Sequence, residues 1–203
     1  SADARSSFNQ KIEGVRTFAG QTVTVSFWAK ADASKDLLVE LLQYFGTGGS
    51  PSSYVTATPQ KFSISSTWTK YTKTFSVPSI TGKTLGTDNN DYLDLAFWID
   101  AGSDYNSRTL SLGNQSGTFE FSQVQVEEGS KATDFEHKPI GQTTRECQRY
   151  FVKTLHVAGG GYATGSGQTA RAYSNATFPA EMRVNPTVSI TVTQSSNCLL
   201  YTS

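Results

Sequence analysis

Residues 119–150 read FEFSQVQVEEGSKATDFEHKPIGQTTRECQRY, and this stretch decides how the chain divides. Apolar residues alternate with polar ones at Phe119 and Phe121, and again at Val124 and Val126 after a slip of one residue, which indicates a half-buried strand with a bulge. The turn EEGS follows, and then a connector whose proline and glycine cannot continue a β ladder. The stretch therefore predicts the end of one β domain and the start of another.

The residues before this stretch alternate in the same way. We expect strands over residues 21–29, 37–45, 54–57, 61–64, 68–77 and 92–99, separated by turns rich in Gly, Pro and Ser. The strand over 37–45 is apolar on both faces, so we place it at the centre of a sheet. Short strands at this spacing are typical of a β-sandwich.

The sequence supports three further expectations for the first domain. Residues 110–112 and 119–126 flank the turn GNQSG and predict a hairpin. We expect no strand before residue 21, and we place Ile12, Val15 and Phe18 in an irregular loop.

The second half gives fainter patterns. We expect a short helix from Thr143 that ends as a strand by Val152, a glycine-rich loop over 159–167, and strands over 168–178 and 187–193. Residues 197–203 continue no pattern and resemble a translated cloning adapter, so we expect a non-native tail.

Composition excludes several classes of function. The chain has 203 residues with 17 basic and 17 acidic side chains, so no basic footprint indicates nucleic acid. No run of 18 apolar residues exists, and residues 1–10 lack a signal peptide, so we expect no membrane insertion. Cys147 and Cys198 form neither a disulfide framework nor a metal cluster, and we expect Cys147 to be a buried free thiol.

The sequence shows no arrangement of carboxylates or histidines that is typical of a catalytic site. A glycosidase needs two carboxylates about 5–9 Å apart across a cleft. Asp94 and Asp100 lie six residues apart on one expected strand, which is about 20 Å. Glu40 and Asp94 could face each other across neighbouring strands, but solvated carboxylates explain them as well. His137 and His156 have no nucleophile motif beside them. We therefore predict that the chain is not an enzyme.

Sugar binding fits the aromatic pattern better. Trp28, Tyr44 and Trp98 each lie opposite the main apolar stripe of their strand, and Glu40, Asp94 and Asp100 lie on the same faces. An aromatic ring covers the apolar face of a pyranose while polar groups take its hydroxyls. We add Gln43, which belongs to the opposite face but lies near a strand end. The alternative is that these rings pack under loops or against another subunit.

The quoted stretch also resembles a known junction. VQVEEGS, KATDFEHKP and ECQRYF resemble bacteriophage tail fibres and related virion fibre proteins, downstream of a jelly-roll domain similar to carbohydrate-binding modules. KIEGVRTFAGQTVTVSFWAKAD and FSVPSITGKTLGTDNNDYLDLAFWI agree with it upstream, and FPAEMRVNPTV resembles the second β unit of the same proteins. Members of this family normally begin with further strands, and residues 197–203 resemble an adapter, so we expect a metagenomic gene fragment truncated at both ends.

The resemblance implies an all-β fold. The expected domains are a jelly-roll β-sandwich over 1–135, a connector over 136–146, a small incomplete β unit over 147–196, and the tail. Modules similar to this one often hold a structural calcium through backbone oxygens and an acidic residue of the closing strand. Here Ser122 and Gln123 stand near that place and the opening strands are lacking, so the sequence departs from the pattern that binds calcium. The loop 88–91 offers further oxygen ligands, although a hydrated turn explains it. We expect no cofactor and leave calcium as an alternative.

The resulting hypothesis is a non-enzymatic, extracellular fibre component of a virion. It would bind a host-surface carbohydrate, and a homotrimer would increase its avidity. Two alternatives remain. One is a structural spacer of the fibre with no ligand, and the other is a carbohydrate-binding appendage of a secreted bacterial glycoside hydrolase.

Overall fold

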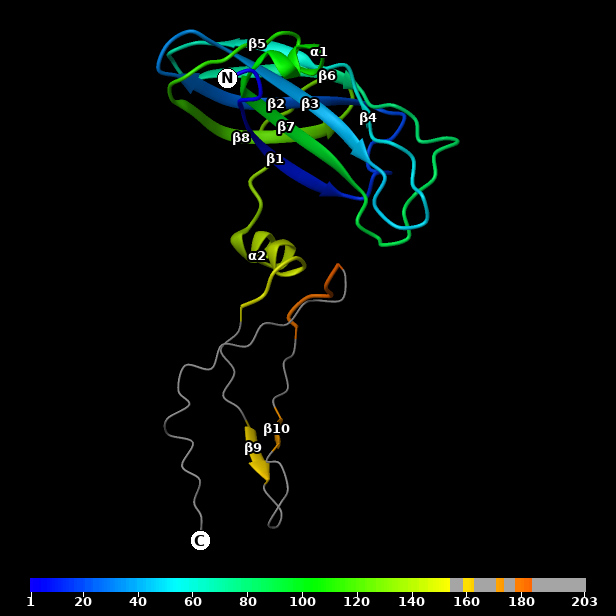
Figure 1. Ribbon diagram of the computed structural model, residues 1–203. Helices are drawn as coiled ribbons and strands as arrows, with labels where there is room; N and C mark the ends of the chain where they lie inside the picture. The colour runs from blue at the N-terminus through cyan, green and yellow to red at the C-terminus, as the bar shows by residue number, and fades with distance from the viewer. Residues whose placement is uncertain (154–158, 163–170, 174–177, 184–203) are drawn as a thin grey trace. The chain divides into compact units, whose positions relative to one another are not determined.

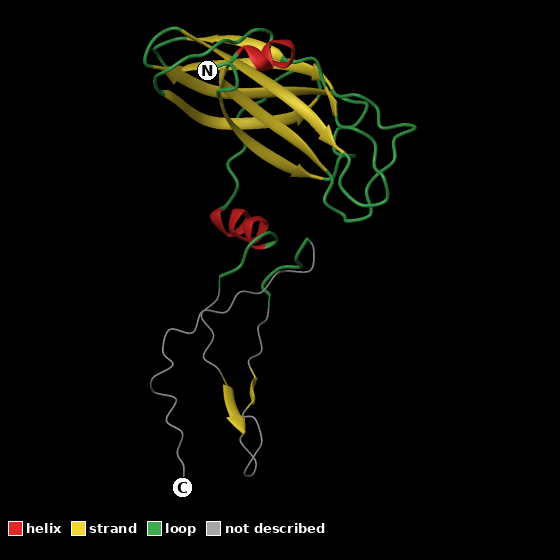
Figure 2. Cartoon of the chain, viewed as in Figure 1, coloured by secondary structure: helices red, strands yellow, loops and turns green. Residues whose placement is uncertain are grey.

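The computed structural model describes residues 1–153, 159–162, 171–173 and 178–183. The chain divides into two compact units, Ser1–Glu136 and His137–Ser203. Strands, drawn yellow in Figure 2, are the main regular structure of the first unit, and long loops connect them. Its two antiparallel sheets make a jelly-roll β-sandwich, so the predicted all-β fold class is confirmed.

The larger sheet has the strand order β1-β7-β3, with two short strands on the far side of β3. Its members are β1 (Arg5–Glu13), β7 (Tyr92–Ala101), β3 (Lys35–Tyr44), β4 (Val55–Thr56) and β5 (Gln60–Ile64). The smaller sheet has the order β6-β2-β8 and contains β6 (Thr69–Ser76), β2 (Thr22–Ala31) and β8 (Phe119–Glu128). Both sheets can be followed in Figure 1. The central position predicted for the strand over 37–45 is therefore correct.

The core lies between the two sheets. The inward side chains of β2, β3 and β7 are fully or almost fully buried, including Val23, Val25, Phe27, Val39, Leu41, Leu93, Leu95 and Phe97. Phe27 lies at the centre of this core, because its ring contacts the rings of Phe62 and Phe97 edge-on, each with 5.2 Å between ring centres. Burying each such ring contributes about 1.5–3 kcal/mol. These are the inward positions that the alternation predicts.

The predicted bulge in the closing strand is confirmed. Ser26 pairs with Gln125 and Trp28 pairs with Ser122, so β8 has one residue more than β2 between these pairs. Gln123 takes up the extra residue with a φ of 50°. Left-handed φ is uncommon for a residue other than glycine.

Two predictions for the first unit are wrong. A strand, β1, precedes residue 21 and pairs with β7. Its inward face carries Phe8 and Ile12 with the polar Gln10 between them, which weakens the apolar alternation. The hairpin is also wrong, because β8 pairs with β2 rather than with residues 110–112. The chain after β7 instead forms two short helices, η1 (Ser103–Tyr105) and α1 (Asn106–Thr109).

The second unit contains α2 (Ile140–Gln148) and a two-stranded sheet of β9 (Gly159–Tyr162) and β10 (Arg171–Tyr173). The predicted helix near residue 143 is confirmed, but no strand follows it by Val152. The expected loop is wrong at residues 159–162, which belong to β9. Cys147 is an exposed free thiol, so its predicted burial is wrong. The strand expected over 187–193, Cys198 and the tail lie outside the described residues.

Candidate functional site

Three tyrosines gather on the outer face of the larger sheet. Tyr92 of β7 pairs with Tyr44 of β3, and their rings stack at 4.8 Å. Tyr54 lies just before β4 and is 57% exposed. It points to the same face as Thr56, which pairs with Leu42. We call this surface, formed by Tyr44, Tyr54, Tyr92, Asp94 and Arg108, the tyrosine face.

A buried ion pair supports one side of the tyrosine face. Glu40 has no exposed surface, and Arg108 of α1 donates to both of its carboxylate oxygens through Nε at 3.0 and 3.1 Å and to Oε2 through Nη2 at 2.8 Å. Trp98 Nε1 also donates to Oε2 at 3.1 Å. Burial alone would lower the pKa of Arg108, but the hydrogen bonds and charge of Glu40 outweigh it and raise that pKa. The pair therefore fixes a permanent cation on this face.

The same cation organises the aromatic rings. The Arg108 guanidinium lies 4.9 Å from the Trp98 ring centre and 5.8 Å from the Tyr54 ring centre. Stacking of this kind suits the planar guanidinium. Arg108 thus connects α1 to Tyr54 and holds the exposed ring in place.

Asp94 is the second buried acid of the tyrosine face. It is 8% exposed, and Asn9 donates to its Oδ2 at 2.7 Å, whereas its Oδ1 is buried without a hydrogen-bond partner. Burial raises the pKa of Asp94, and the Asn9 hydrogen bond and the charge of Lys11 oppose that rise. A buried acceptor oxygen without a donor costs free energy, and a ligand hydroxyl could reach this one only if the surrounding side chains moved.

The structure separates the predicted site residues. Glu40, Tyr44, Asp94 and Trp98 share the outer face of the larger sheet, and Asp100 lies at its end, where the Gln115 backbone N–H donates to it at 2.6 Å. Gln43 is fully buried inside the sandwich and donates to the Pro78 carbonyl, so its expected reorientation is wrong. Trp28 lies on β2 of the opposite sheet.

For Trp98 the structure agrees with the alternative interpretation, in which an outward ring packs under a connecting segment. The residue is only 4% exposed and packs with Leu38, Ala96 and Leu112. Tyr105 of η1 contacts it at 5.7 Å. The short helices after β7 cover this ring, and the alternation of a strand cannot reveal such a cover.

Four residues of the site were not predicted from the sequence: Asn9, Tyr54, Tyr92 and Arg108. The sequence does indicate Tyr92, because it lies two residues before Asp94 and therefore on the same face of the strand. Tyr54 had only its place in an expected strand. Asn9 and Arg108 have no local signal, because they reach their partners from segments 85 and 68 residues away.

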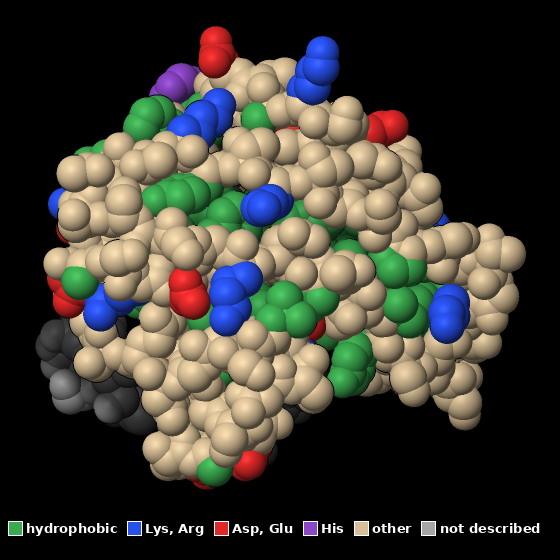
Figure 3. Space-filling view, turned by 90° about the horizontal axis from the view of Figure 1, so that it is seen from above, with side chains coloured by type: hydrophobic (Ala, Val, Ile, Leu, Met, Phe, Trp, Pro, Cys, Tyr) green, Lys and Arg blue, Asp and Glu red, His purple; other side chains and the backbone are tan. Residues whose placement is uncertain are grey.

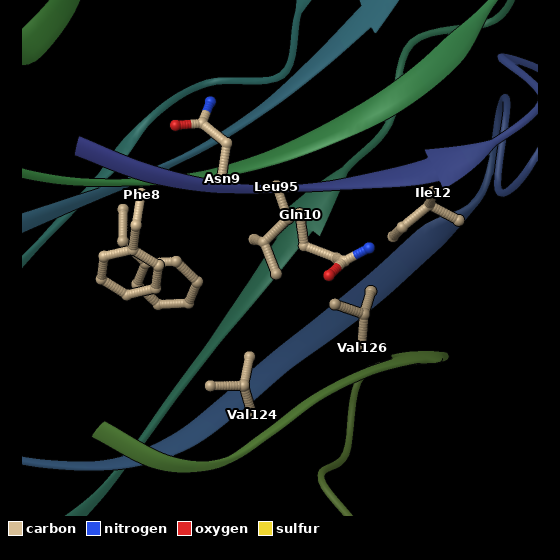
Figure 4. A pocket seen from close by; sticks show the side chains of 8 residues that line it. Phe8, Asn9, Gln10, Ile12, Leu95, Val124 and Val126 are labelled. Atoms are coloured by element: carbon tan, nitrogen blue, oxygen red, sulfur yellow. The ribbon is translucent and has the colours of Figure 1, made fainter. Parts of the chain in front are cut away.

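A separate cleft of about 430 Å³ opens between β1 and β8. Figure 4 shows Phe8, Gln10 and Ile12 of β1 and Leu95 of β7 pointing towards Val124 and Val126 of β8, while Asn9 points the other way. Gln10 is the one polar side chain that points into it. Ligand pockets combine an apolar wall with several convergent polar groups. The cleft is therefore an open side of the sandwich rather than a site for a polar ligand.

Within the part of the chain that the structure describes, no metal centre competes with the tyrosine face. The described residues contain no group of three metal-ligating side chains. In the loop 88–91, Asp88 and Asn90 hydrogen-bond with Thr47 instead. Figure 3 shows charged side chains of both signs scattered over the surface seen from above. Among the described residues, no helix is long and apolar enough to cross a membrane.

Comparison with known proteins gives a match to a family and a likeness to solved structures. Residues 10–87 match the family described as "Carbohydrate binding domain". A solved structure described as "CBM4 structure and function" is 22% identical, with a TM-score of 0.39 and 61% of each chain covered. The chain thus spans less than two thirds of that structure. No curated protein matches.

Proposed function

We propose that the first unit binds a carbohydrate chain on the tyrosine face without cleaving it. The observation that carries this proposal is the arrangement of one exposed and two half-buried tyrosine rings beside the Arg108 guanidinium. Tyr54 and the stacked Tyr44–Tyr92 pair offer ring surfaces to the apolar side of a sugar. Arg108, whose side chain is 32% exposed, supplies a donor for hydroxyls. The match of residues 10–87 to a carbohydrate-binding family supports the same ligand class.

The absence of catalysis in this proposal rests on the state of the carboxylates. Glu40 is fully buried and already accepts hydrogen bonds from Arg108 and Trp98. A glycosidase acid must reach the glycosidic oxygen, and a second carboxylate must reach the sugar or a water. Glu40 can do neither without breaking its ion pair, so we assign it a positioning role.

The test compares ring removal with hydroxyl removal. Tyr54→Ala should weaken binding to a glycan array at least tenfold, or about 1.4 kcal/mol. Tyr54→Phe, which keeps the ring, should retain most of the binding. Because Tyr54 is more than half exposed, neither variant should lower the melting temperature appreciably. Unchanged binding by Tyr54→Ala and by Tyr92→Ala would refute the proposed site.

We further propose that this binding unit is a fibre component of a virion that attaches to a host-surface glycan. The support is the resemblance of residues 124–150 to the fibre junction. A homotrimer would bring three tyrosine faces to one surface, which makes the second and third contacts effectively intramolecular. Light scattering on the full chain tests the trimer, and a glycosidase domain in the same reading frame would favour the hydrolase appendage instead.

A further inference from the structure

Trp28 is the predicted site residue that the tyrosine face leaves out. It lies on β2, where its neighbours Val25 and Phe27 point into the core and are fully buried. Trp28 therefore points outward from the smaller sheet, on the opposite surface of the sandwich. It is 36% exposed, and Trp68 is 44% exposed.

The two indoles are neighbours on that surface. Trp28 pairs with Lys70 of β6, and Trp68 lies one residue before β6 begins. Lys30, two residues after Trp28 on the same strand, places its Nζ 5.4 Å from the Trp68 ring centre. Trp28 and Trp68 are thus diagonal across the β2–β6 pair, a separation of about 7–8 Å. We call Trp28, Lys30, Trp68, Lys70 and Glu120 the tryptophan platform.

The polar groups of the platform are held in place. Lys30 forms an ion pair with Glu120 of β8 at 2.8 Å, and Lys70 donates to the Thr133 carbonyl at 3.0 Å. Each lysine thus has a partner, and each flanks an indole. The platform therefore alternates ring surface with fixed hydrogen-bonding groups, whereas the centre of a protein interface is depleted of charge.

The turn that carries Trp68 is also fixed. The Ser65 backbone N–H donates to Tyr71 Oη at 2.8 Å, and Ser65 Oγ donates to the Thr67 carbonyl at 2.8 Å. The Ala31 N–H donates to the Ser65 carbonyl at 2.9 Å, which ties the turn to β2. A ring held this way loses little conformational entropy when a ligand binds.

The backbone facing Trp28 is strained. Ser122 pairs with Trp28, and the next residue, Gln123, has the left-handed φ of 50° that creates the bulge. Bulges with such residues are often found beside functional sites, where they redirect a side chain. This is independent of the exposure of the indoles, and it falls at the same point of the sheet.

We propose that the tryptophan platform is a second carbohydrate-binding site. Its ligand is a glycan, because two adjacent indoles fit consecutive apolar sugar faces, and Lys30 and Lys70 lie beside them as donors for hydroxyls. This inference rests on the proposed function and extends it. One sandwich would hold two glycan chains on opposite surfaces and cross-link them.

The test uses the full chain and soluble hexaoses of glucose, xylose, mannose and galactose. Isothermal titration with the bound sugar should give two sites per chain. Trp28→Ala/Trp68→Ala should leave one site, Tyr54→Ala/Tyr92→Ala should leave the other, and the combination should bind at least a hundredfold more weakly. Phe151→Ala, which removes an exposed ring of the second unit, should leave both sites intact. Trp68→Ala alone, outside any strand, gives the same test should the double variant misfold.

The outcomes separate the two proposals. One site that only the tyrosine variants remove would overturn the tryptophan platform and leave the proposed function standing. One site that only the tryptophan variants remove would support the platform and overturn the tyrosine face. No binding of any hexaose by the wild-type chain would overturn both. Binding of two sites that neither pair of variants changes would also overturn both.

Discussion

Removing the Arg108 side chain tests the ion pair beneath the tyrosine face. In Arg108→Met, Glu40 loses three hydrogen bonds of 2.8–3.1 Å and keeps only the Trp98 donor. Breaking a buried ion pair by removing one partner costs about 3–5 kcal/mol, because a buried charge is left alone. Since 32% of the Arg108 side chain is exposed, water can reach the vacated position. We therefore expect a smaller loss of about 2–4 kcal/mol.

Urea unfolding and thermal melting measure this loss. For a unit of this size, roughly 3 °C of melting temperature corresponds to 1 kcal/mol, so Arg108→Met should melt about 6–12 °C lower. The double variant Glu40→Gln/Arg108→Met should recover at least half of the loss. Its buried amide is neutral and can still accept the hydrogen bond from Trp98.

Lys61→Met is the matched control. Lys61 pairs with Asp36 at 3.7 Å on the surface, and both side chains are about a third or more exposed. Exposed pairs contribute about 0–1 kcal/mol, so this variant should melt almost like the wild type. The reasoning fails if Arg108→Met costs no more than Lys61→Met, or if the double variant is as unstable as the single one.

Four further expectations follow from the described residues. Trp98→Ala should cost about 3–5 kcal/mol of stability, measured by urea unfolding, because the ring is buried; a loss below about 1 kcal/mol would mean that it is exposed. Because burial raises the pKa of Asp94 in the folded state, the folded state binds more protons than the unfolded state. The free energy of unfolding should therefore fall as the pH rises above about 4, and this dependence on pH should be missing in Asp94→Asn. Gln123→Gly should raise stability by about 0.5–1 kcal/mol by relieving the left-handed φ, whereas an unchanged or lower melting point would contradict the strain. Cys147 should react with a thiol reagent at the same rate in native and unfolded protein, since it is exposed.

The strands that the sequence predicts well are those with an uninterrupted inward stripe. In β2 and β7, and in β3 as far as Leu41, the inward residues are apolar and mostly buried, so local periodicity and tertiary packing agree. The sequence did not predict β1, because Gln10 interrupts its apolar stripe and faces a cleft rather than the core. The prediction of a hairpin before β8 was wrong for another reason. Its turn signal was local, but the partner of β8 is about a hundred residues earlier in the chain.

The candidate site was predictable in part for the same reason. Alternation correctly placed Glu40, Tyr44 and Asp94 outward from the larger sheet. It could not say that Arg108 neutralises Glu40, because that contact depends on where α1 lies after β7. Alternation also could not assign Trp28 to a different sheet, because it shows which side chains of a strand point outward but not which sheet contains the strand.

Exposure of an outward aromatic residue is decided by the connections between strands. Trp28 and Trp98 occupy equivalent outward positions in their strands, yet their exposed fractions are 36% and 4%. The helices η1 and α1 follow β7 directly and bring Tyr105 and Arg108 over Trp98. The turn before β6 instead adds a second exposed indole, Trp68, beside Trp28. A jelly-roll sheet thus supplies many candidate rings on both surfaces, and its connections select which of them a ligand can reach.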